Sequence, residues 1–331
     1  MKKIAIIHIG APKTGTTSIQ IFCYKNRRIL LNKYGIYYPE HKQLIRPESG
    51  YGHHYLAFHL FKDDPICSRI TPEYIDLDNT FEYLKEGIRN RKHKILLLSC
   101  ERLINSILSN RFDKFLSILK ETYDSINIIL FIRKQDDIIL SMYGTRILMG
   151  LYQSLDDFIQ ESLNRFDFYS LIKKYENKGI KVNLCVYKKE ENSVQNFLDI
   201  VSKIIEKKII IGDTMVYENK SLPWFVIQIM ADLLKEKLPK ENFLALRNLG
   251  YLLIKNQNIP ANYKYLAPPS LRQKILKAFE NSNRKLSSEY LGLVNKLWYE
   301  ENEDQLTDED WEKEYKNRAI MHLCNSILGG K

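Results

Sequence analysis

The sequence contains few cysteines, and no two of them have the spacing of a metal-binding or redox motif. Five cysteines are spread over 331 residues, none in a C-x-x-C arrangement, and most lie in apolar runs. An odd, scattered set favours neither a disulfide framework nor a zinc site. The sequence therefore predicts reduced, buried thiols in a cytoplasmic protein, at Cys23, Cys67, Cys100, Cys185 and Cys324.

Long hydrophobic runs are also absent, because no apolar stretch approaches the length of a membrane-spanning helix. The segment MKKIAIIHIG has a basic start, but its apolar part is too short for the core of a signal peptide. No small-residue cleavage site follows it. We therefore expect a protein that acts in the cytoplasm. If its substrate is membrane-bound, the protein would reach it from the cytoplasmic face.

Acidic residues are outnumbered by basic ones. The chain has 50 Lys and Arg against 40 Asp and Glu, so its formal net charge is +10. A positive balance favours an anionic partner such as a nucleotide cofactor. The basic residues are dispersed and are not interleaved with aromatic residues, so a nucleic-acid partner is not predicted.

Four short apolar runs have the composition of buried parallel strands. They are rich in Ile, Leu and Val and alternate little, as expected where helices cover both faces of a sheet. The segments between them carry apolar residues at helical spacing, so strands alternate with helices. This pattern predicts an α/β fold with a doubly wound parallel sheet. The four runs are residues 4–9, 95–99, 126–132 and 182–187.

Two of the helical segments have recognisable ends. Residues 16–35 read as one helix that stops at Gly35, and residues 136–150 begin with two acids and end at Gly150. The strand signal ends with a last apolar run near residue 211, and helical patterns follow it. We predict a single domain over residues 1–331, in which residues 1–212 form the α/β core and residues 213–331 a mainly helical extension.

The loop after the first predicted strand lacks the lysine of a nucleoside-triphosphate loop. Gly10 and Gly15 have the separation found in G-x-x-x-x-G-K-[ST], but Thr16 follows the second glycine and the lysine stands earlier, at Lys13. A strand, such a loop and a helix place backbone N–H groups around an anion. Hydroxyl groups that could add donors belong to Thr14, Thr16, Thr17 and Ser18.

The residues PKTGTTS resemble the 5′-phosphosulfate loop of sulfotransferases, which use 3′-phosphoadenosine 5′-phosphosulfate (PAPS). The resemblance implies a P-loop-NTPase-like sheet, PAPS as cofactor and 3′,5′-adenosine bisphosphate as product, without a metal. It also implies that Lys13 contacts the bridging oxygen between sulfur and phosphorus. Lys13 would then be catalytic, because negative charge grows on that oxygen in the transition state. The residues that would bind the cofactor here are Pro12, Lys13, Thr14, Gly15, Thr16, Thr17 and Ser18.

A second motif, FIRKQDDIILSMY, places Arg133 at the end of a predicted strand and Ser141 eight residues later in a helix. Sulfotransferases have an arginine and a serine at this separation, and the resemblance implies that both bind the 3′-phosphate of PAPS. A guanidinium fork and a hydroxyl donor suit a phosphate dianion. Tyr187 in VYKKEEN matches the family's tyrosine near the adenine, although Lys188 follows where the family often has an acid.

The resemblance is dense from residue 7 to about residue 190 and thin afterwards. In the thin part, ENKSLPW and FENSNRKLSSEYLG resemble carboxyl-terminal segments of bacterial carbohydrate sulfotransferases. This similarity implies a glycan or glycolipid as acceptor.

Sulfuryl transfer needs a base near the acceptor hydroxyl, and Glu101 is the first candidate. It follows the strand at residues 95–99, at the edge of the sheet where ligands bind in α/β folds. The residues alone leave two interpretations open, a catalytic base or a helix amino-terminal acid with Ser99 as N-cap. The resemblance to heparan-type and bacterial sulfotransferases, which use a glutamate here, favours the base.

The segment YGHHYLAFHL contains the other candidates, His53, His54 and His59. Cytosolic small-molecule sulfotransferases use a histidine base, but theirs follows the second strand, where this chain has Glu101. Bacterial relatives have a similar histidine segment, so we expect His53 or His54 to contact the acceptor, with His54 as the alternative base. His59 is interpreted as structural. No histidine pair at metal spacing joins a carboxylate, so no metal site is predicted.

The leading interpretation is a PAPS-dependent sulfotransferase that acts on a glycan or glycolipid hydroxyl by in-line displacement without a metal. A kinase or NTPase of the same fold is the first alternative, and it would need Mg²⁺ and a lysine after Gly15. A sulfotransferase acting on a small molecule is the second. A binding module without catalysis is the third, and Lys13, Arg133 and Ser141 argue against it.

Overall fold

The computed structural model divides the chain into two compact units. The first comprises Met1–Arg133 and Tyr169–Glu218, and the second Lys134–Phe168 and Asn219–Lys331. The predicted boundary near residue 212 lies close to the end of the first unit, but residues 134–168 group with the carboxyl-terminal helices. The residues that the structure describes are 2–63, 71–89, 92–188, 190–212, 222, 224–237, 241, 243–248, 267–293, 297–298 and 307–313.

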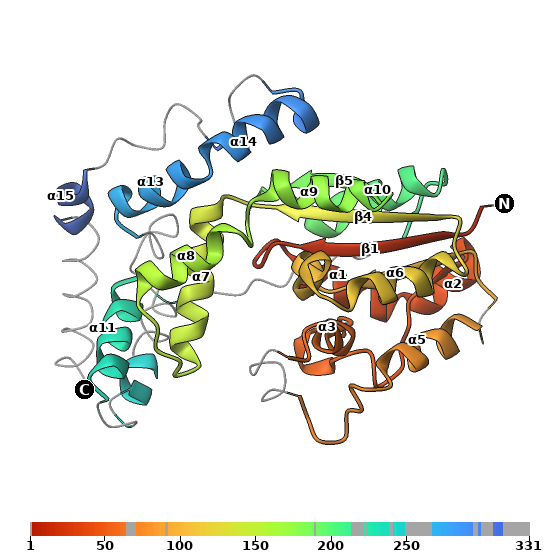
Figure 1. Ribbon diagram of the computed structural model, residues 1–331, viewed down its shortest axis with the longest axis horizontal. Coiled ribbons are helices and arrows are strands. Elements are labelled where there is room, and N and C mark those ends of the chain that lie inside the picture. The colour runs from red at the N-terminus through yellow and green to blue at the C-terminus, as the bar shows by residue number, and fades with distance from the viewer. Residues whose placement is uncertain are drawn as a thin grey trace. The chain divides into compact units, whose positions relative to one another are not determined.

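A five-stranded sheet forms the centre of the first unit (Figure 1). Its order is β2-β3-β1-β4-β5, and every neighbouring pair is parallel. The chain adds strands first on one side of β1 and then on the other, so the sheet is doubly wound and P-loop-NTPase-like, as predicted. In such sheets ligands bind at the carboxyl ends of the strands, where the winding reverses. The strands are β1 (Ile4–Gly10), β2 (Ile36–Tyr37), β3 (Ile95–Ser99), β4 (Ser125–Ile132) and β5 (Lys181–Val186).

The four predicted strands are confirmed to within one residue at each end. The pattern missed β2, because two residues are too few to show a period. It also suggested a strand near residue 211, but residues 209–212 form none. Instead, Ile209 is buried in the core, and Ile210 exchanges two hydrogen bonds with the Tyr34 hydroxyl, at 2.9 and 3.0 Å. This segment covers the core without pairing to the sheet.

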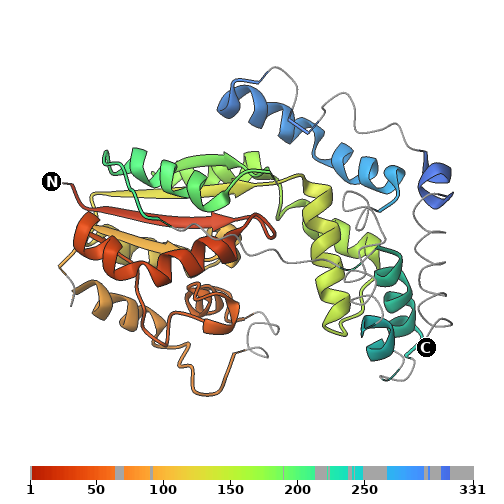
Figure 2. The same ribbon diagram turned by 180° about the vertical axis from the view of Figure 1, so that it is seen from behind.

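Helices cover both faces of the sheet, which explains why its strands are apolar on both sides (Figures 1 and 2). On one face, Ile19 of α1 and Phe197 of α10 belong to one buried cluster. On the other, the rings of Tyr175 in α9 and Phe112 in α6 lie 5.8 Å apart. The helices are α1 (Thr16–Lys25), α2 (Arg27–Tyr34), α3 (His54–Leu60), α5 (Thr80–Arg89), the 3₁₀ helix η2 (Glu101–Leu108), α6 (Phe112–Lys120), α9 (Phe168–Asn177) and α10 (Ser193–Ile204).

The helix predicted over residues 16–35 is broken into α1 and α2 at Asn26. The side-chain amide of Asn26 donates to the carbonyl of Phe22 at 3.0 Å. Asparagine side chains compete in this way for helix carbonyls, and the apolar period does not reveal the competition. The predicted stop at Gly35 is confirmed, because this glycine is left-handed with φ 69° and ends α2.

The second unit is helical in its described residues, as predicted for the carboxyl-terminal part. Arg272 of α13 bonds the buried carboxylate of Asp136 at 2.6 Å and that of Asp137 at 3.0 Å. Gln135 and Asn283 exchange two buried hydrogen bonds. These bonds hold α13 and α14 on the first turn of α7, which is why residues 134–168 join this unit. Its helices are α7 (Gln135–Leu148), α8 (Leu155–Leu163), α11 (Trp224–Lys235), α13 (Pro269–Ala278), α14 (Glu280–Leu286), the π-helical turn Ser287–Leu291 and α15 (Asp308–Trp311).

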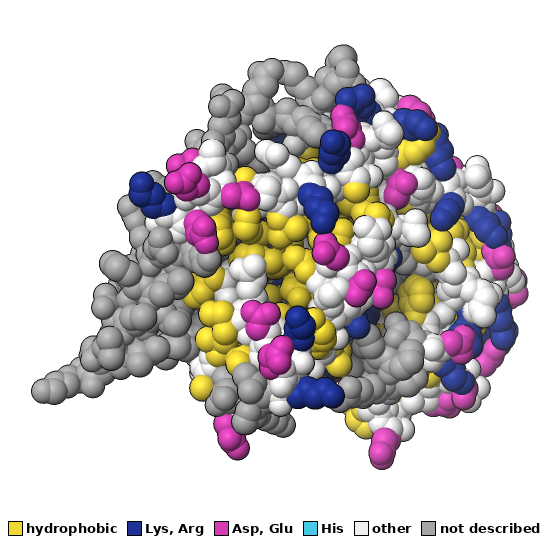
Figure 3. Space-filling model, turned by 60° about the vertical axis from the view of Figure 1, so that its left-hand side comes forward, with side chains coloured by type: hydrophobic (Ala, Val, Ile, Leu, Met, Phe, Trp, Pro, Cys, Tyr) yellow, Lys and Arg dark blue, Asp and Glu magenta, His cyan; other side chains and the backbone are white. Residues whose placement is uncertain are grey.

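Among the described helices, none combines the length and apolarity that a membrane crossing requires. On the face displayed in Figure 3, hydrophobic side chains gather near the centre. Basic and acidic side chains are interspersed around them, so the described part of this face carries no surface of a single charge.

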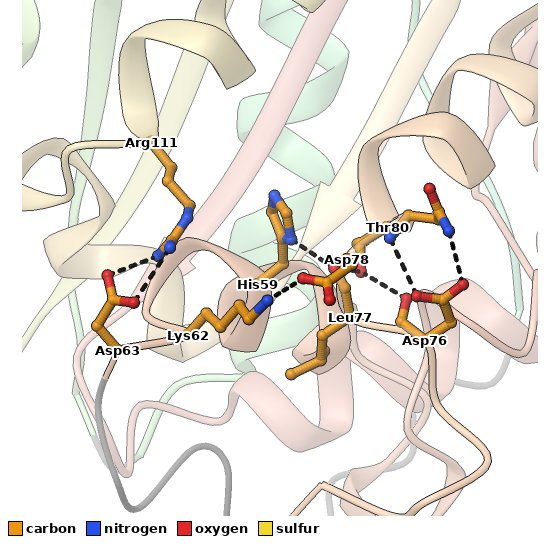
Figure 4. A network of polar contacts seen from close by, with 9 residues as sticks. His59, Lys62, Asp63, Asp76, Leu77, Asp78, Thr80 and Arg111 are labelled. Carbon is orange, nitrogen blue, oxygen red and sulfur yellow. Dashed lines mark hydrogen bonds and ion pairs between the residues drawn. The ribbon is translucent and has the colours of Figure 1, made fainter.

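His59, expected to be structural, lies in a network at the carboxyl end of α3 (Figure 4). Its Nδ1–H donates to the carbonyl of Leu77 at 2.5 Å, and its ring packs edge-on against Phe81. Beside it, Lys62 pairs with Asp78. These contacts attach α3 to the segment before α5, and they give His59 a structural role.

Candidate active site

The loop between β1 and α1 is closed by hydrogen bonds of its own. The N–H of Ala11 donates to the carbonyl of Phe131 on β4 at 2.8 Å, which fixes the start of the loop. The hydroxyl of Thr14 donates to the carbonyl of Ala11 at 2.7 Å. Thr14 was expected to donate its hydroxyl to a ligand, but its proton stabilises the loop. Lys13 adopts a left-handed conformation with φ 67°, which is uncommon for a residue other than glycine.

Both loop glycines are required by close contacts. A Cβ on Gly10 would lie 2.6 Å from the Cγ2 atom of Thr16. A Cβ on Gly15 would lie 2.2 Å from the Oγ atom of Ser193, and Gly15 also has φ 78°. The chain therefore passes tightly over the amino terminus of α10, where Ser193 is buried without a hydrogen-bond partner for its hydroxyl.

The helix that follows the loop suits an anion. Its first turn contains Thr16, Thr17 and Ser18, of which Thr16 and Ser18 are buried, and no acidic residue. The N–H groups at a helix start are partly unsatisfied and carry positive potential, so an anion is stabilised there.

Lys13, Arg133 and Tyr187 meet at this loop. Arg133 follows β4 and donates from Nη1 to the carbonyl of Lys13 at 3.0 Å. Its guanidinium carbon lies 5.6 Å from the ring centroid of Tyr187, which follows β5. Burial lowers the pKa of Lys13, the positive Arg133 lowers it further, and Glu101 opposes both. Three residues from three strand ends thus interact where the sequence predicted cofactor contacts.

Ser141 belongs to the second unit, on α7, and Arg133 to the first. The Oγ atom of Ser141 is buried and has no hydrogen-bond partner. Buried hydroxyl groups rarely remain unpaired, so an unsatisfied one fits a site that a ligand oxygen would complete.

Glu101 lies just past the end of β3, and its side chain is 26% exposed. Its Oε2 atom accepts a hydrogen bond from Nε2 of Gln20 at 3.0 Å and lies 4.0 Å from Nε2 of His54. Burial acts to raise the pKa of Glu101, but His54 and the hydrogen bond from Gln20 outweigh it and hold the pKa below its ordinary value. Glu101 is therefore a carboxylate at neutral pH.

Glu101 is also the acidic residue in the first turn of η2, as in the alternative interpretation, but Ser99 does not cap that helix. The hydroxyl of Ser99 lies 2.7 Å from Nδ1 of the buried His8, on β1. The residue before η2 is Cys100, and no side chain caps that helix. Ser99 therefore holds β3 to β1 through a side-chain contact.

The structure separates the two adjacent histidines. His53 is fully buried, its Nδ1 accepts from the N–H of Ser99 at 3.0 Å, and its Nε2–H donates to the carbonyl of Pro39 at 3.1 Å. Both ring nitrogens of His53 therefore form hydrogen bonds with the backbone, and of the two histidines only His54 is close to Glu101. His54 is 2% exposed, and its Nε2 atom has no hydrogen-bond partner although Glu101 is near. Burial lowers its pKa.

Three potential metal ligands also meet here. The ligand atoms of His54, Cys100 and Glu101 lie within 4.8 Å of one another. However, burial raises the pKa of the Cys100 thiol well above its ordinary value, which opposes the thiolate that a metal would need. We assign no metal to this cluster.

Lowering the pH should destabilise the fold through the two buried histidines behind the site. Burial lowers the pKa of His8 to about 3 and that of His53 to about 4, from 6.5. As the pH falls, these histidines take up protons in the unfolded chain before they do so in the folded protein. Their contribution to the free energy of unfolding is therefore fully present above pH 6.5 and declines below it. Each histidine contributes up to about 1.4 kcal/mol per pH unit to that decline.

Urea unfolding at pH 7 and pH 5 measures this slope. His53→Asn should reduce it, whereas the control His41→Asn, which replaces an exposed ring, should leave it unchanged. A free energy of unfolding that does not change between these pH values would contradict the prediction.

Sequence reasoning missed two polar residues of this region, Gln20 and Ser193. Gln20 had a weak signal, since it is an amide among the buried residues of α1. Ser193 had none, because only its contact with Gly15 distinguishes it from other serines.

No protein-family model and no curated protein sequence matches the chain. Among solved structures, the chain is similar to a sulfotransferase from Alicyclobacillus acidocaldarius, with 13% identity and a TM-score of 0.45, over 86% of this chain and 94% of that one. It is also similar to a retinol dehydratase in complex with androsterone and the inactive cofactor PAP. That match has 12% identity and a TM-score of 0.28, over 70% of this chain and 64% of that one.

Proposed function

We propose that this chain is a sulfotransferase that transfers the sulfuryl group of PAPS to a hydroxyl of a glycan or glycolipid. The observation that carries the proposal is the hydrogen bond from Nη1 of Arg133 to the carbonyl of Lys13, at 3.0 Å, which joins the end of β4 to the loop after β1. The same edge of the sheet carries Glu101, directly after β3. Leaving-group stabilisation and proton removal require this combination at one site.

The residues around the loop fit PAPS. Residues 12–18 would hold the 5′-phosphosulfate on the amino terminus of α1, and Tyr187 would lie near the adenine. Arg133 and Ser141 would bind the 3′-phosphate, an assignment that rests on the motif FIRKQDDIILSMY. When bound, PAPS supplies an activated sulfuryl group whose leaving group is adenosine bisphosphate.

Glu101 acts as the base in the proposed reaction. It takes the proton of the acceptor hydroxyl while that oxygen forms a bond to sulfur and the bond from sulfur to the bridging oxygen breaks. Lys13 stabilises the negative charge that the bridging oxygen acquires. His54, which faces Glu101, contacts the acceptor. The proton ends on Glu101 and the electron pair on the leaving oxygen.

The acceptor class rests on the similarity of the carboxyl-terminal segments to bacterial carbohydrate sulfotransferases. Mass spectrometry of glycans and glycolipids after incubation with PAPS tests it by the mass of an added sulfuryl group. Transfer only to small phenols or amines would keep the enzyme class and overturn the acceptor class.

We propose that the partner is not a nucleic acid, since the basic residues are dispersed along the sequence and are not interleaved with aromatic residues. We propose that the enzyme acts in the cytoplasm, and from the cytoplasmic face of the membrane if the acceptor is a glycolipid.

Arg133→Ala should weaken the binding of 3′,5′-adenosine bisphosphate by roughly 1.5–3 kcal/mol, as expected for a hydrogen bond to a charged group. Calorimetry without Mg²⁺ measures this loss. Lys134→Ala removes the same charge one residue later and is the matched control, with a smaller expected effect. ATP binding that requires Mg²⁺, together with no affinity for the bisphosphate, would favour a kinase or NTPase and contradict the proposal.

A further inference from the structure

Gln20 is a buried amide whose contact with the active site has no role in the reaction proposed so far. It lies on α1, the helix that begins at the phosphosulfate loop, and it is fully buried. Its Nε2–H donates to Oε2 of Glu101 at 3.0 Å. One side chain thus links the helix of the cofactor loop to the proposed base.

The segment before α3 holds this amide in place. A Cβ on Gly52 would lie 2.6 Å from Cδ and 2.7 Å from Oε1 of Gln20, so the backbone packs directly on the amide. A Cβ on Gly50 would likewise lie 2.9 Å from the methyl group of Thr17. The amide is therefore enclosed by α1, the Gly50–Gly52 backbone and the end of β3, and it has little room to turn away from Glu101.

We propose that Gln20 is a positioning residue that orients the Glu101 carboxylate and keeps it ionised for proton removal. The inference rests on the proposed function. Among the contacts of described side chains with Glu101, the bond from Gln20 and the approach of His54 both go to Oε2. Gln20 therefore fixes one of the two carboxylate oxygens on the side of α1.

A hydrogen bond donated to a carboxylate favours the ionised form over the acid. Gln20 is neutral, so its effect does not change with pH, in contrast to that of the titratable groups around Glu101. Those groups are His8 of β1, Lys13 of the loop, Tyr38 after β2, His54 of α3, and Cys100 and Arg102 beside Glu101.

Gln20→Met and Gln20→Glu test the proposal in the full-length protein. Methionine keeps the length and removes the donor, so the acid limb of the pH–rate profile should shift to higher pH. Glutamate places a second carboxylate beside Glu101, and two carboxylates at one site cannot both ionise readily. Gln20→Glu should therefore shift the same limb further. In both variants turnover should recover in part at higher pH.

Gln43→Met is the matched control. Gln43 is also buried, and its amide bonds the backbone of Tyr74 and Asp76 at 3.0 and 2.8 Å. Its replacement removes comparable hydrogen bonds and should leave the pH profile unchanged. An equal shift in Gln43→Met would overturn the specific role of Gln20.

Carbon-13 NMR of the glutamate carboxyl groups gives a second measurement that does not depend on activity. The Glu101 signal is assigned by its loss in Glu101→Gln, and its titration should move to higher pH in both Gln20 variants. An unmoved titration would overturn the inference. If the wild-type protein transfers no sulfuryl group to any acceptor, the proposed function fails, and the titration still decides whether Gln20 controls Glu101.

Discussion

Glu101→Gln should reduce sulfuryl transfer by about 10²–10⁴-fold, the usual cost of removing a general base. Glutamine keeps the shape of the side chain and one acceptor oxygen, so the hydrogen bond from Gln20 can persist. It cannot take the proton of the acceptor hydroxyl. Single-turnover measurements with PAPS should therefore show the loss, whereas calorimetry should show unchanged binding of the bisphosphate.

His54→Asn is the comparison that assigns the base. His54 faces Glu101 but is nearly inaccessible, and burial lowers its pKa. We expect this variant mainly to raise the KM of the acceptor. If His54→Asn abolishes turnover and Glu101→Gln leaves it within a few-fold, the two roles must be exchanged. A sulfotransferase would remain, but with a histidine base.

The sheet could be predicted because each strand is recognisable from the residues of its own short segment. Each of the four longer strands is a short, mainly apolar run, and such a run can be recognised without knowledge of its partner strand. The break at Asn26 was not predictable from the period, because a side chain that bonds a helix carbonyl leaves the apolar spacing unchanged. The grouping of residues 134–168 with the carboxyl-terminal helices depends on Arg272, which lies more than 130 positions from its two partners in the sequence.

The residues of the site also divide into those that the local sequence predicts and those that depend on distant contacts. Lys13, Arg133 and Tyr187 lie at predicted strand ends, and parallel strands bring such ends to one edge. The difference between His53 and His54 could not be predicted, since two adjacent histidines cannot be distinguished by the sequence pattern around them. Their roles separate only where Ser99 and Pro39 supply backbone partners to His53. Gln20 was missed because its position depends on the absence of a side chain at Gly52.

Lys13→Ala should reduce turnover by about 10²–10³-fold and leave the affinity for the bisphosphate nearly unchanged. The charge that Lys13 stabilises grows on the bridging oxygen only as the bond to sulfur breaks, so its loss should appear in kcat. The loop itself should remain, because Ala11, Thr14 and Phe131 hold it by hydrogen bonds that do not involve the lysine side chain.

The pH dependence of this variant distinguishes a leaving-group role from simple anchoring. Burial and Arg133 lower the pKa of Lys13, so the wild-type enzyme should lose activity on the alkaline side as the ammonium loses its proton. Lys13→Ala has no such proton and should lack that limb. Lys134→Ala, with the same loss of charge, should keep both the limb and most of the turnover. If Lys13→Ala loses turnover and bisphosphate affinity by equal factors, the lysine is a phosphate anchor, and the leaving oxygen must be stabilised by another group.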